Sequence, residues 1–371
     1  MLTRRNFARL AAAGAAGRVL TEAAYAQRAA LRMTDLPKDM VWLNANENPA
    51  GPPRAAIEAA TAAVPVAWRY HYQEFGEFYA AVAQSEGFTP DQVTVGAGST
   101  EVLNEAVQAF TSPTRPMIAM HPTFEGPLEA ARALGRAVVR VPLTPAYAAD
   151  VRRMAAEADK AGGGLLYLCN PNNPTGAVTP KADMDWLVAN LPRDTVLLVD
   201  EAYIHFGDSP ELASVLDAVR QGKSVIVART FSKIYGMAGM RAGFGIARPD
   251  FIERMASYRN NVISYVTTRA VLAALAEAGT IVPERRAVLS RTRKALFAWL
   301  KERNLRYIES QANFLMIDVG RPAVEMIGRM ARLGVAPGRP FPPLDNMLRV
   351  TIGTDADMAK FREVFWKVYQ G

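Results

Sequence analysis

The feature that most constrains the fold of this chain is a series of short apolar segments separated by longer helical patterns. Several of the short segments are apolar on consecutive residues, as expected of strands that are buried on both faces. The stretches between them are long enough to form crossover helices. The pattern predicts an α/β domain with a mostly parallel sheet flanked by helices, whose strands fall at residues 92–98, 116–121, 164–169, 195–200, 224–230 and 242–247.

The pattern changes after about residue 263. Long helical stretches follow, with strand-like segments at 313–319 and 347–353, which predicts a smaller α+β lobe. Two lobes suit a chain of 371 residues, since single cores stop growing at roughly 250–300 residues. Residues 27–55 are predicted to form an N-terminal segment that packs on the small domain. The large domain that binds the ligand is predicted at 56–262, and the small C-terminal domain at 263–371.

The first 26 residues are predicted to form an export signal. Arg4 and Arg5 precede a small-residue apolar run at 10–17, and residues 24–26 (AYA) give an A-x-A cleavage pattern. This order resembles a twin-arginine signal, which implies export to the periplasm. Arg18 shortens the apolar run, so the alternative is the ordinary N-terminus of a cytoplasmic protein.

Composition excludes several classes of protein. The single cysteine, Cys169, excludes an intramolecular disulfide, and three histidines argue against a histidine-rich metal centre, so we expect no metal. The densest basic stretch, at 285–294, has no interleaved aromatic residues and is predicted to be a solvated helix face rather than a nucleic-acid site. Outside the N-terminal segment, no run approaches the roughly 18 apolar residues of a membrane span.

Ligands of parallel sheets bind beyond the carboxyl ends of the strands, so the residues after each predicted strand are candidates for chemistry. The strand at 92–98 leads through glycines to Ser99 and Thr100 at the start of a helix. Backbone N–H groups and two hydroxyls at a helix N-terminus can form a cradle for phosphate. The alternative is that Ser99 or Thr100 only caps the helix.

Polar side chains also follow the next two buried strands. Asn173 lies in a turn with two prolines and a glycine, from which its amide can donate one directed hydrogen bond. Asp200 ends the strand at 195–200, and a carboxylate in such a position requires a cationic partner. Tyr203 places a phenol three residues later.

The strand at 224–230 is followed by Thr230, Ser232 and Lys233, and Arg241 lies eight residues beyond the lysine. A single lysine is usually solvated, but here cations, a carboxylate, a phenol and an amide follow successive strands. This set suits pyridoxal 5'-phosphate. That cofactor needs a lysine for a Schiff base, a carboxylate to keep its pyridine nitrogen protonated, and donors for its phenolic oxygen and phosphate.

With the motifs in this order, the chain resembles the fold type I pyridoxal-phosphate enzymes, specifically the class I and II aminotransferases. It is most similar to the histidinol-phosphate aminotransferase subgroup, from about residue 40 to the C-terminus. The resemblance implies a seven-stranded sheet and transfer of an amino group between an amino acid and a 2-oxo acid. It is carried by LNANENP (43–49), NPNNPTG (170–176), DEAY (200–203), TFSK (230–233) and LRVTIGT (348–354).

The resemblance also implies roles for single residues. Lys233 would hold the cofactor as an aldimine and move the substrate proton, Asp200 would pair with the pyridinium, and Tyr203 would bind the phenolic oxygen. These three are the predicted catalytic residues. The other implied cofactor contacts are Asn173 at the phenolic oxygen, Phe124 stacked on the ring, and Ser99, Thr100, Thr230, Ser232 and Arg241 at the phosphate. An ordinary core position is the alternative for Phe124.

Substrate and subunit contacts are implied in the same way. Arg349 matches the arginine that grips the substrate carboxylate through a bidentate pair. Asn46 and Arg339 are the other predicted substrate contacts. Tyr70 matches a tyrosine that reaches the phosphate from the neighbouring subunit, which implies an obligate homodimer with shared sites.

Three departures from the subgroup bear on the substrate. Ala50 stands where the subgroup has a tyrosine that contacts the substrate phosphate, and the segment at 71–78 (HYQEFGEF) differs from the usual run. Arg339 matches a second anion-binding arginine only loosely. We therefore expect the substrates to be free amino acids, aromatic or otherwise large, rather than histidinol phosphate.

Two other functions could use the same residues. An amino-acid decarboxylase with this cofactor would share Lys233, Asp200 and Arg241, although a carboxylate clamped by Arg349 is not readily lost. A non-catalytic cofactor-binding module is the second alternative. It is disfavoured because every catalytic position of the family pattern is filled.

Overall fold

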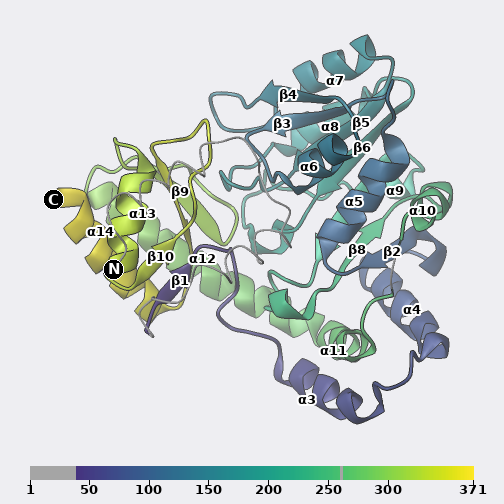
Figure 1. Ribbon diagram of the computed structural model, residues 1–371, viewed down its shortest axis with the longest axis horizontal. Helices are drawn as coiled ribbons and strands as arrows, with labels where there is room; N and C mark the ends of the chain where they lie inside the picture. Colours follow the sequence, from purple (N-terminus) through teal and green to yellow (C-terminus); the bar gives the residue numbers. More distant parts are fainter. Residues whose placement is uncertain (1–38, 260–261) are drawn as a thin grey trace.

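The computed structural model describes residues 39–259 and 262–371. Figure 1 shows a larger lobe built around one sheet and, beside it, a smaller lobe that carries the C-terminus. The predicted export signal at 1–26 lies outside the described residues.

A seven-stranded sheet forms the centre of the larger lobe, with strand order β2-β8-β7-β6-β5-β3-β4. Within this sheet only β8 runs antiparallel to its neighbours, so the predicted mostly parallel sheet is confirmed. The strands are β2 (Val93–Gly96), β3 (Met117–His121), β4 (Val138–Pro142), β5 (Gly164–Cys169), β6 (Thr195–Asp200), β7 (Val225–Thr230) and β8 (Gly243–Ile246).

Helices flank this sheet, and β5, β6 and β7 are buried along their whole length, as their continuous apolar sequences require. The α-helices of this lobe are α3 (Arg54–Ala63), α4 (Phe75–Glu86), α5 (Ser99–Phe110), α6 (Gly126–Ala133), α7 (Val151–Lys160), α8 (Lys181–Ala189), α9 (Leu216–Arg220), α10 (Pro249–Ala256) and α11 (Tyr265–Ala276). Short 3-10 turns lie at η1 (Val64–Val66), η2 (Tyr72–Glu74), η3 (Pro90–Gln92), η4 (Ile204–Phe206) and η5 (Ala238–Met240).

The smaller lobe is built on two pairs of strands. β9 (Phe314–Asp318) and β11 (Met347–Thr351) are antiparallel and coincide with the two predicted segments. β1 (Val41–Leu43) runs parallel to β10 (Val335–Pro337), so the N-terminal segment pairs with this lobe. Helices α13 (Ala323–Arg332) and α14 (Asp355–Gln370) cover the strands around a separate apolar core.

The lobes are joined by the long helix α12 (Ala278–Glu302). The preceding helix, α11, lies after the predicted boundary at residue 263, yet Ala270, Val271 and Ala274 pack in the core of the larger lobe. Leu296 and Leu300 of α12 pack in the core of the smaller lobe. We therefore place the passage between the lobes within α12.

The basic stretch at 285–294 is only in part the solvated helix face that its sequence predicts, since Arg291 and Lys294 are exposed and Arg293 is not. Arg293 is 1% exposed. Its guanidinium donates hydrogen bonds to the Phe206 carbonyl at 3.2 Å and to Asp208 Oδ1 at 2.9 Å. Arg286 donates to the His205 carbonyl. The prediction was wrong for Arg286 and Arg293 because composition does not reveal which face of a helix meets a neighbour, and long cationic side chains can bury their stems there.

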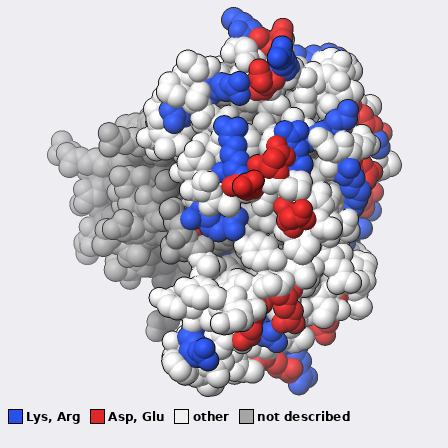
Figure 2. Space-filling view, turned by 90° about the vertical axis from the view of Figure 1, so that its right-hand side faces the viewer, with Lys and Arg blue, Asp and Glu red and all other residues white. Residues whose placement is uncertain are grey.

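Two further observations concern the surface. Figure 2 shows one face of the molecule, on which Lys and Arg side chains are interspersed with Asp and Glu. Among the described residues no single helix is long and apolar enough to cross a membrane, and α11 and α12 reach that criterion only as a pair bent by 80°.

Candidate active site

Asp200 ends β6 and is buried, with 3% of its surface exposed. The Tyr167 hydroxyl donates to Asp200 Oδ2 at 3.2 Å, and the Ala202 N–H donates to Oδ1 at 3.1 Å. Burial raises the pKa of Asp200 to about 6, although these two donors and the charge of Lys233 act to lower it. A cation bound beside this carboxylate would stabilise its charged form.

Tyr203 is the hydrogen-bonding centre of the site. Its hydroxyl accepts from Asn46 Nδ2 at 3.1 Å and from Asn173 Nδ2 at 3.4 Å. Burial raises the pKa of the phenol well above its usual range, so the hydroxyl keeps its proton and can donate it in a hydrogen bond to an oxyanion. The ring of Phe314 packs edge-on against Tyr203, with centroids 5.0 Å apart.

Lys233 follows β7 and is half-buried. Its Nζ donates to the Ala45 carbonyl at 3.2 Å and lies 5.7 Å from the centroid of the Tyr203 ring. The same ammonium is near enough to Asp200 to lower the pKa of that carboxyl. The amine, the phenol and the carboxylate predicted to be catalytic therefore gather at the carboxyl ends of β6 and β7.

The start of α5 forms a compact cradle. Arg241, with a left-handed φ of 57°, directs its guanidinium here, and Nη2 donates to the Ala97 carbonyl at 3.2 Å. A Cβ at Gly98 would lie 2.6 Å from that Nη2, and a Cβ at Gly243 would lie 2.2 Å from the Ser99 nitrogen. The two glycines thus allow the arginine and β8 to approach the helix N-terminus, where N–H groups favour an anion.

Hydroxyl groups complete this cradle on the side of β7. Thr230 and Ser232 are buried, and their hydroxyl oxygens lie 2.9 Å apart. Ser99 and Thr100 occupy the first turn of α5. Four hydroxyls, an arginine and the positive end of a helix are a suitable set of donors for a phosphate group.

Arg349 reaches the site from β11 of the smaller lobe and is 6% exposed. Nη1 donates to Asn173 Oδ1 at 2.8 Å, and Nη2 donates to the Asn44 carbonyl at 2.6 Å. Its guanidinium carbon lies 4.5 Å from the centroid of the Phe341 ring. Asn173 therefore links the arginine of one lobe to the Tyr203 hydroxyl of the other.

The N-terminal segment is fastened to this site by Asn46, which is buried and has a left-handed φ of 55°. Its N–H donates to Thr351 Oγ1 at 2.9 Å, and its carbonyl accepts from Asn313 Nδ2 at 2.9 Å. Asn46 is thereby held between the smaller lobe and Tyr203. The structure thus places this predicted substrate contact beside a predicted catalytic residue.

Three predicted residues lie at or beyond the edge of this cluster. Arg339 lies 4.2 Å from the centroid of the Phe341 ring and forms an ion pair with Glu125 of the larger lobe. Phe124 follows β3 and packs half-buried against the large core. Tyr70 is 71% exposed and stacks on another exposed tyrosine, so in a single chain it does not join the cradle.

Sequence reasoning missed three residues that shape the site: Tyr167, Glu125 and Asn313. The only sequence signal for Tyr167 is a hydroxyl within the apolar run of β5. Glu125 directly follows the predicted Phe124, and Asn313 is the first residue of the predicted strand-like segment at 313–319. Their partners lie far away in the sequence, so their roles depend on the tertiary structure.

The residues fit pyridoxal 5'-phosphate on chemical grounds. The site combines a primary amine, a buried carboxylate with a raised pKa, a protonated phenol and a phosphate cradle. Among residues 39–259 and 262–371, no group of three or more His, Cys, Asp and Glu side chains could hold a metal ion. The fold and the site therefore define a pyridoxal-phosphate-dependent enzyme of fold type I.

Comparison with known proteins identifies the family. Residues 38–365 match aminotransferase class I and II, and the chain belongs to this family. It is 37% identical to histidinol-phosphate aminotransferase of Symbiobacterium thermophilum, over 88% of this chain and 89% of the relative. It is 32% identical to aromatic amino acid aminotransferase of Cutibacterium acnes, over 90% of this chain and 94% of that relative.

A solved structure shares the fold. Histidinol-phosphate aminotransferase of Sinorhizobium meliloti, in complex with pyridoxal 5'-phosphate, superposes with a TM-score of 0.84 at 23% identity, over 96% of both chains. The protein is thus a pyridoxal-phosphate-dependent aminotransferase with small-molecule amino acid and keto acid substrates.

Proposed function

We propose that this aminotransferase acts on free amino acids with aromatic or otherwise large side chains. The observation that carries the proposal is the ion pair between Arg339 and Glu125. A phosphate carries up to two negative charges and is held best by more than one cation, and here the charge of Arg339 is neutralised by Glu125 of the larger lobe. Arg349 supplies the guanidinium for one carboxylate.

The relatives leave both substrate classes open, because the names of similar proteins include histidinol-phosphate and aromatic amino acid aminotransferases. Two features of this chain favour the free amino acid. Ala50 offers no hydroxyl for a phosphate, and Phe341 lies against both Arg339 and Arg349, which places an aromatic ring beside the two arginines. An apolar side chain of the substrate would be desolvated there.

The residues of the candidate active site have separate tasks in this reaction. Bound pyridoxal 5'-phosphate supplies an electron sink that stabilises negative charge at the substrate Cα. We propose that Lys233 Nζ is the point of covalent attachment and later the base that moves the proton at Cα. Asp200 would keep the ring nitrogen protonated, while Tyr203 and Asn173 would bind the phenolic oxygen. Arg349 orients the substrate carboxylate so that the Cα proton faces the lysine.

A half-reaction screen tests the substrate proposal. The holoenzyme is mixed with single amino acids or with histidinol phosphate, and the change in cofactor absorbance is followed. We expect kcat/KM for aromatic amino acids to exceed that for histidinol phosphate by at least about tenfold. Keto acid should form without carbon dioxide, which separates transamination from decarboxylation. A preference for histidinol phosphate would refute the proposal.

The attachment of the cofactor to Lys233 is tested separately. Lys233→Ala should lower the rate by roughly 10³-fold or more, because the proton-transfer group is lost. Borohydride reduction of the wild-type holoenzyme should fix the cofactor on the peptide that contains Lys233, as read by mass spectrometry. Labelling of another lysine would overturn this assignment.

We further propose a homodimer in which Tyr70 enters the neighbouring site. Tyr70 belongs to a segment whose large side chains are exposed, and an apolar strip of this kind is typical of a protein interface. Its exposed members are Val64, Val66, Trp68, Tyr70 and Tyr72. The test is sedimentation of Trp68→Glu, which should yield monomers with weakened cofactor retention, whereas a stable wild-type monomer would contradict the dimer.

Export is also a proposal. The twin-arginine pattern at 1–26 supports it, and a periplasmic enzyme with the single buried Cys169 needs no disulfide to fold. N-terminal sequencing of the mature protein tests it: Gln27 as the first residue supports export, and Met1 or Leu2 favours the cytoplasmic alternative.

A further inference from the structure

We propose a second ligand site for a small multivalent anion, such as a molecule with two linked phosphates, at the amino ends of the central strands. A cavity of about 550 Å³ opens there, lined by Gly164, Thr195 and Ser224 where β5, β6 and β7 begin. The catalytic residues follow the other ends of the same strands. A six-residue strand spans roughly 17 Å, so this cavity, called here the amino-end cavity, is separate from the active site.

The walls of the amino-end cavity are strongly cationic. Its only carboxylate among the lining residues is Asp194, which lies 3.6 Å from the Arg115 guanidinium. Among the described residues, Arg193 and Lys223 have no carboxylate within ion-pair distance, and both are exposed. A concave surface lined by one sign of charge concentrates the field and attracts the opposite ion. The cationic lining residues are Arg115, Arg193, Lys223, Arg248 and Arg254.

Two of these arginines are held in place by aromatic rings. The guanidinium of Arg248 lies 4.0 Å from the centroid of the Phe251 ring, and that of Arg254 lies 4.7 Å from that of Phe110. Stacking fixes a guanidinium plane and leaves N–H donors at its edge. The Nε of Arg248 is bound by Asp250 at 2.8 Å, so this arginine presents its terminal N–H groups. Because the arginines cover these rings, the cavity favours an anion without a large aromatic group.

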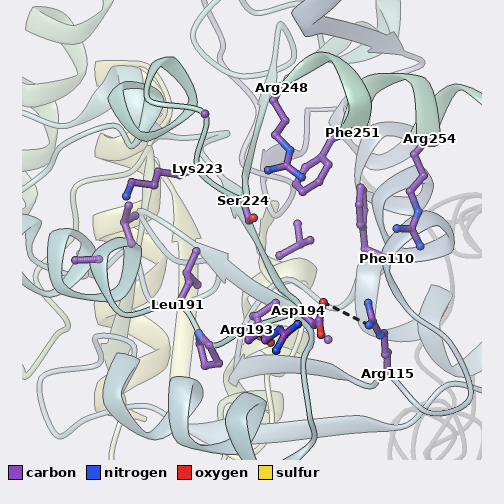
Figure 3. Close-up of a pocket in the computed structure, with 17 residues that line it drawn as sticks. Phe110, Arg115, Leu191, Arg193, Asp194, Lys223, Ser224, Arg248, Phe251 and Arg254 are labelled. Carbon is purple, nitrogen blue, oxygen red and sulfur yellow. Dashed lines mark hydrogen bonds and ion pairs between the residues drawn. The ribbon is translucent and has the colours of Figure 1, made fainter.

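The backbone beneath the cavity is rigid. Gly164 has a φ of 146°, and a Cβ there would lie 2.4 Å from the Pro116 carbonyl oxygen. Asp194 has a left-handed φ of 57°, and Arg115 is tied to Ser112 by backbone hydrogen bonds. Figure 3 shows Arg115 and Asp194 on one side of the hollow and Arg248 with Phe251 on the other. The charged groups are therefore presented by several loops and by helix α10 rather than by one segment.

The ligand class follows from these observations. Five cations line the cavity, of which Arg115 pairs with Asp194 and Arg248 with Asp250. Among the described residues, the three other lining cations have no carboxylate within ion-pair distance, which leaves an excess of positive charge that a monovalent ion cannot neutralise. The cavity has room for several heavy atoms, and guanidinium groups match phosphate oxygens bidentately. Inorganic pyrophosphate is therefore the probe that fits both the size and the charge of the site.

Calorimetric titration of the holoenzyme with pyrophosphate, at constant ionic strength, tests the proposal. In the holoenzyme the cofactor fills the phosphate cradle, and its absorbance reports any displacement. We expect one binding event per chain in the wild type and at least about tenfold weaker binding in Arg193→Glu and in Lys223→Glu. Lys301→Glu, which reverses an exposed charge on α12, is the matched control and should bind like the wild type.

The activity and binding of the variants distinguish the proposed site from the active site. All these variants should keep the wild-type aminotransferase rate without pyrophosphate, because none of the altered residues lies at the active site. Equal binding by all variants would show that pyrophosphate does not use the amino-end cavity. Release of the cofactor during titration would place the anion in the cradle, and absence of binding to the wild type would also overturn the proposal.

Discussion

The Tyr167 hydroxyl donates a hydrogen bond of 3.2 Å to Asp200 Oδ2, across the pair of strands β5 and β6. Tyr167 is completely buried, and burial raises its own pKa well above the usual range, so the hydroxyl keeps its proton and can donate it to the carboxylate. The carboxylate that we propose to pair with the cofactor ring is therefore held in position from the neighbouring strand. This contact acts on the reaction through Asp200 rather than by touching the substrate.

Tyr167→Phe removes that donor with little change in volume. Because the hydrogen bond favours the charged carboxylate, its loss should raise the pKa of Asp200 further. We expect cofactor affinity at neutral pH to fall about tenfold to a hundredfold, in line with one hydrogen bond to a charged group. The pH midpoint of cofactor binding should move upward, which a purely structural defect would not cause. An unchanged midpoint would contradict the assigned role.

Asp200→Asn should separate stability from function. The pKa of Asp200 is about 6 in the folded chain, which is higher than its ordinary value of 3.8. This group therefore destabilises the folded apoprotein increasingly as the pH rises from about 4 to 6, and the loss of stability persists above pH 6. Above pH 6 the free energy of unfolding of the variant apoprotein should therefore be higher than that of the wild type by roughly 1–3 kcal/mol, as measured by denaturant titration. At pH 4 we expect no gain. Cofactor retention should fall. Asp217→Asn, at an exposed position, is the control.

Glu125→Gln should release Arg339 from its ion pair and broaden the substrate range. We expect kcat/KM for histidinol phosphate to rise by about fivefold to tenfold, because a second guanidinium becomes available to a phosphate. Values for aromatic amino acids should stay within about twofold. The double variant Glu125→Gln, Arg339→Gln should lose the gain, and a gain that persists there would exclude Arg339 as its source.

Arg349→Lys should weaken substrate binding, because an ammonium cannot replace a planar guanidinium that binds a carboxylate through two parallel bonds. We expect KM for amino acids to rise by roughly tenfold to a hundredfold, with the cofactor spectrum unchanged. Arg339→Lys provides the comparison and should leave KM for free amino acids near the wild-type value. Equal effects of both substitutions would contradict the assignment of the carboxylate to Arg349.

The junction of the lobes should be acid-sensitive through Asp208. Burial acts to raise the pKa of this carboxyl, but hydrogen bonds from Lys294 and Ser290 and the charge of Arg293 outweigh it and hold the pKa at about 2. A lowered pKa contributes stability above about pH 4 that is lost as pH falls toward 2. Asp208→Asn should thus lower the unfolding temperature at pH 7, with a difference that shrinks below pH 4.

Much of the large domain was predictable because its central strands are buried on both faces. Burial on both faces makes a strand apolar on every residue, and β5, β6 and β7 coincide with predicted segments almost residue for residue. The strand β4 was not predicted. It lies at the edge of the sheet, where Arg140 faces solvent and the apolar run is broken.

The cofactor class was predictable for a related reason. Parallel strands bring their carboxyl ends to one edge of the sheet, so Asn173, Asp200 and Lys233 could be placed together from the chain order alone. Sequence could not show that Arg339 is neutralised by Glu125, since these residues are brought together only when the smaller lobe packs on the larger one.

By itself the sequence determined the mostly parallel sheet, the cofactor and the family, because these depend on local periodicity and on motifs of a few consecutive residues. Only the tertiary structure decided what depends on register and docking. In β5, Cys169 lies opposite Asp200, and the two-residue period of a strand turns Tyr167 to the same face, toward the carboxylate. The docking of α12 likewise buries Arg293, a residue that composition assigns to the surface.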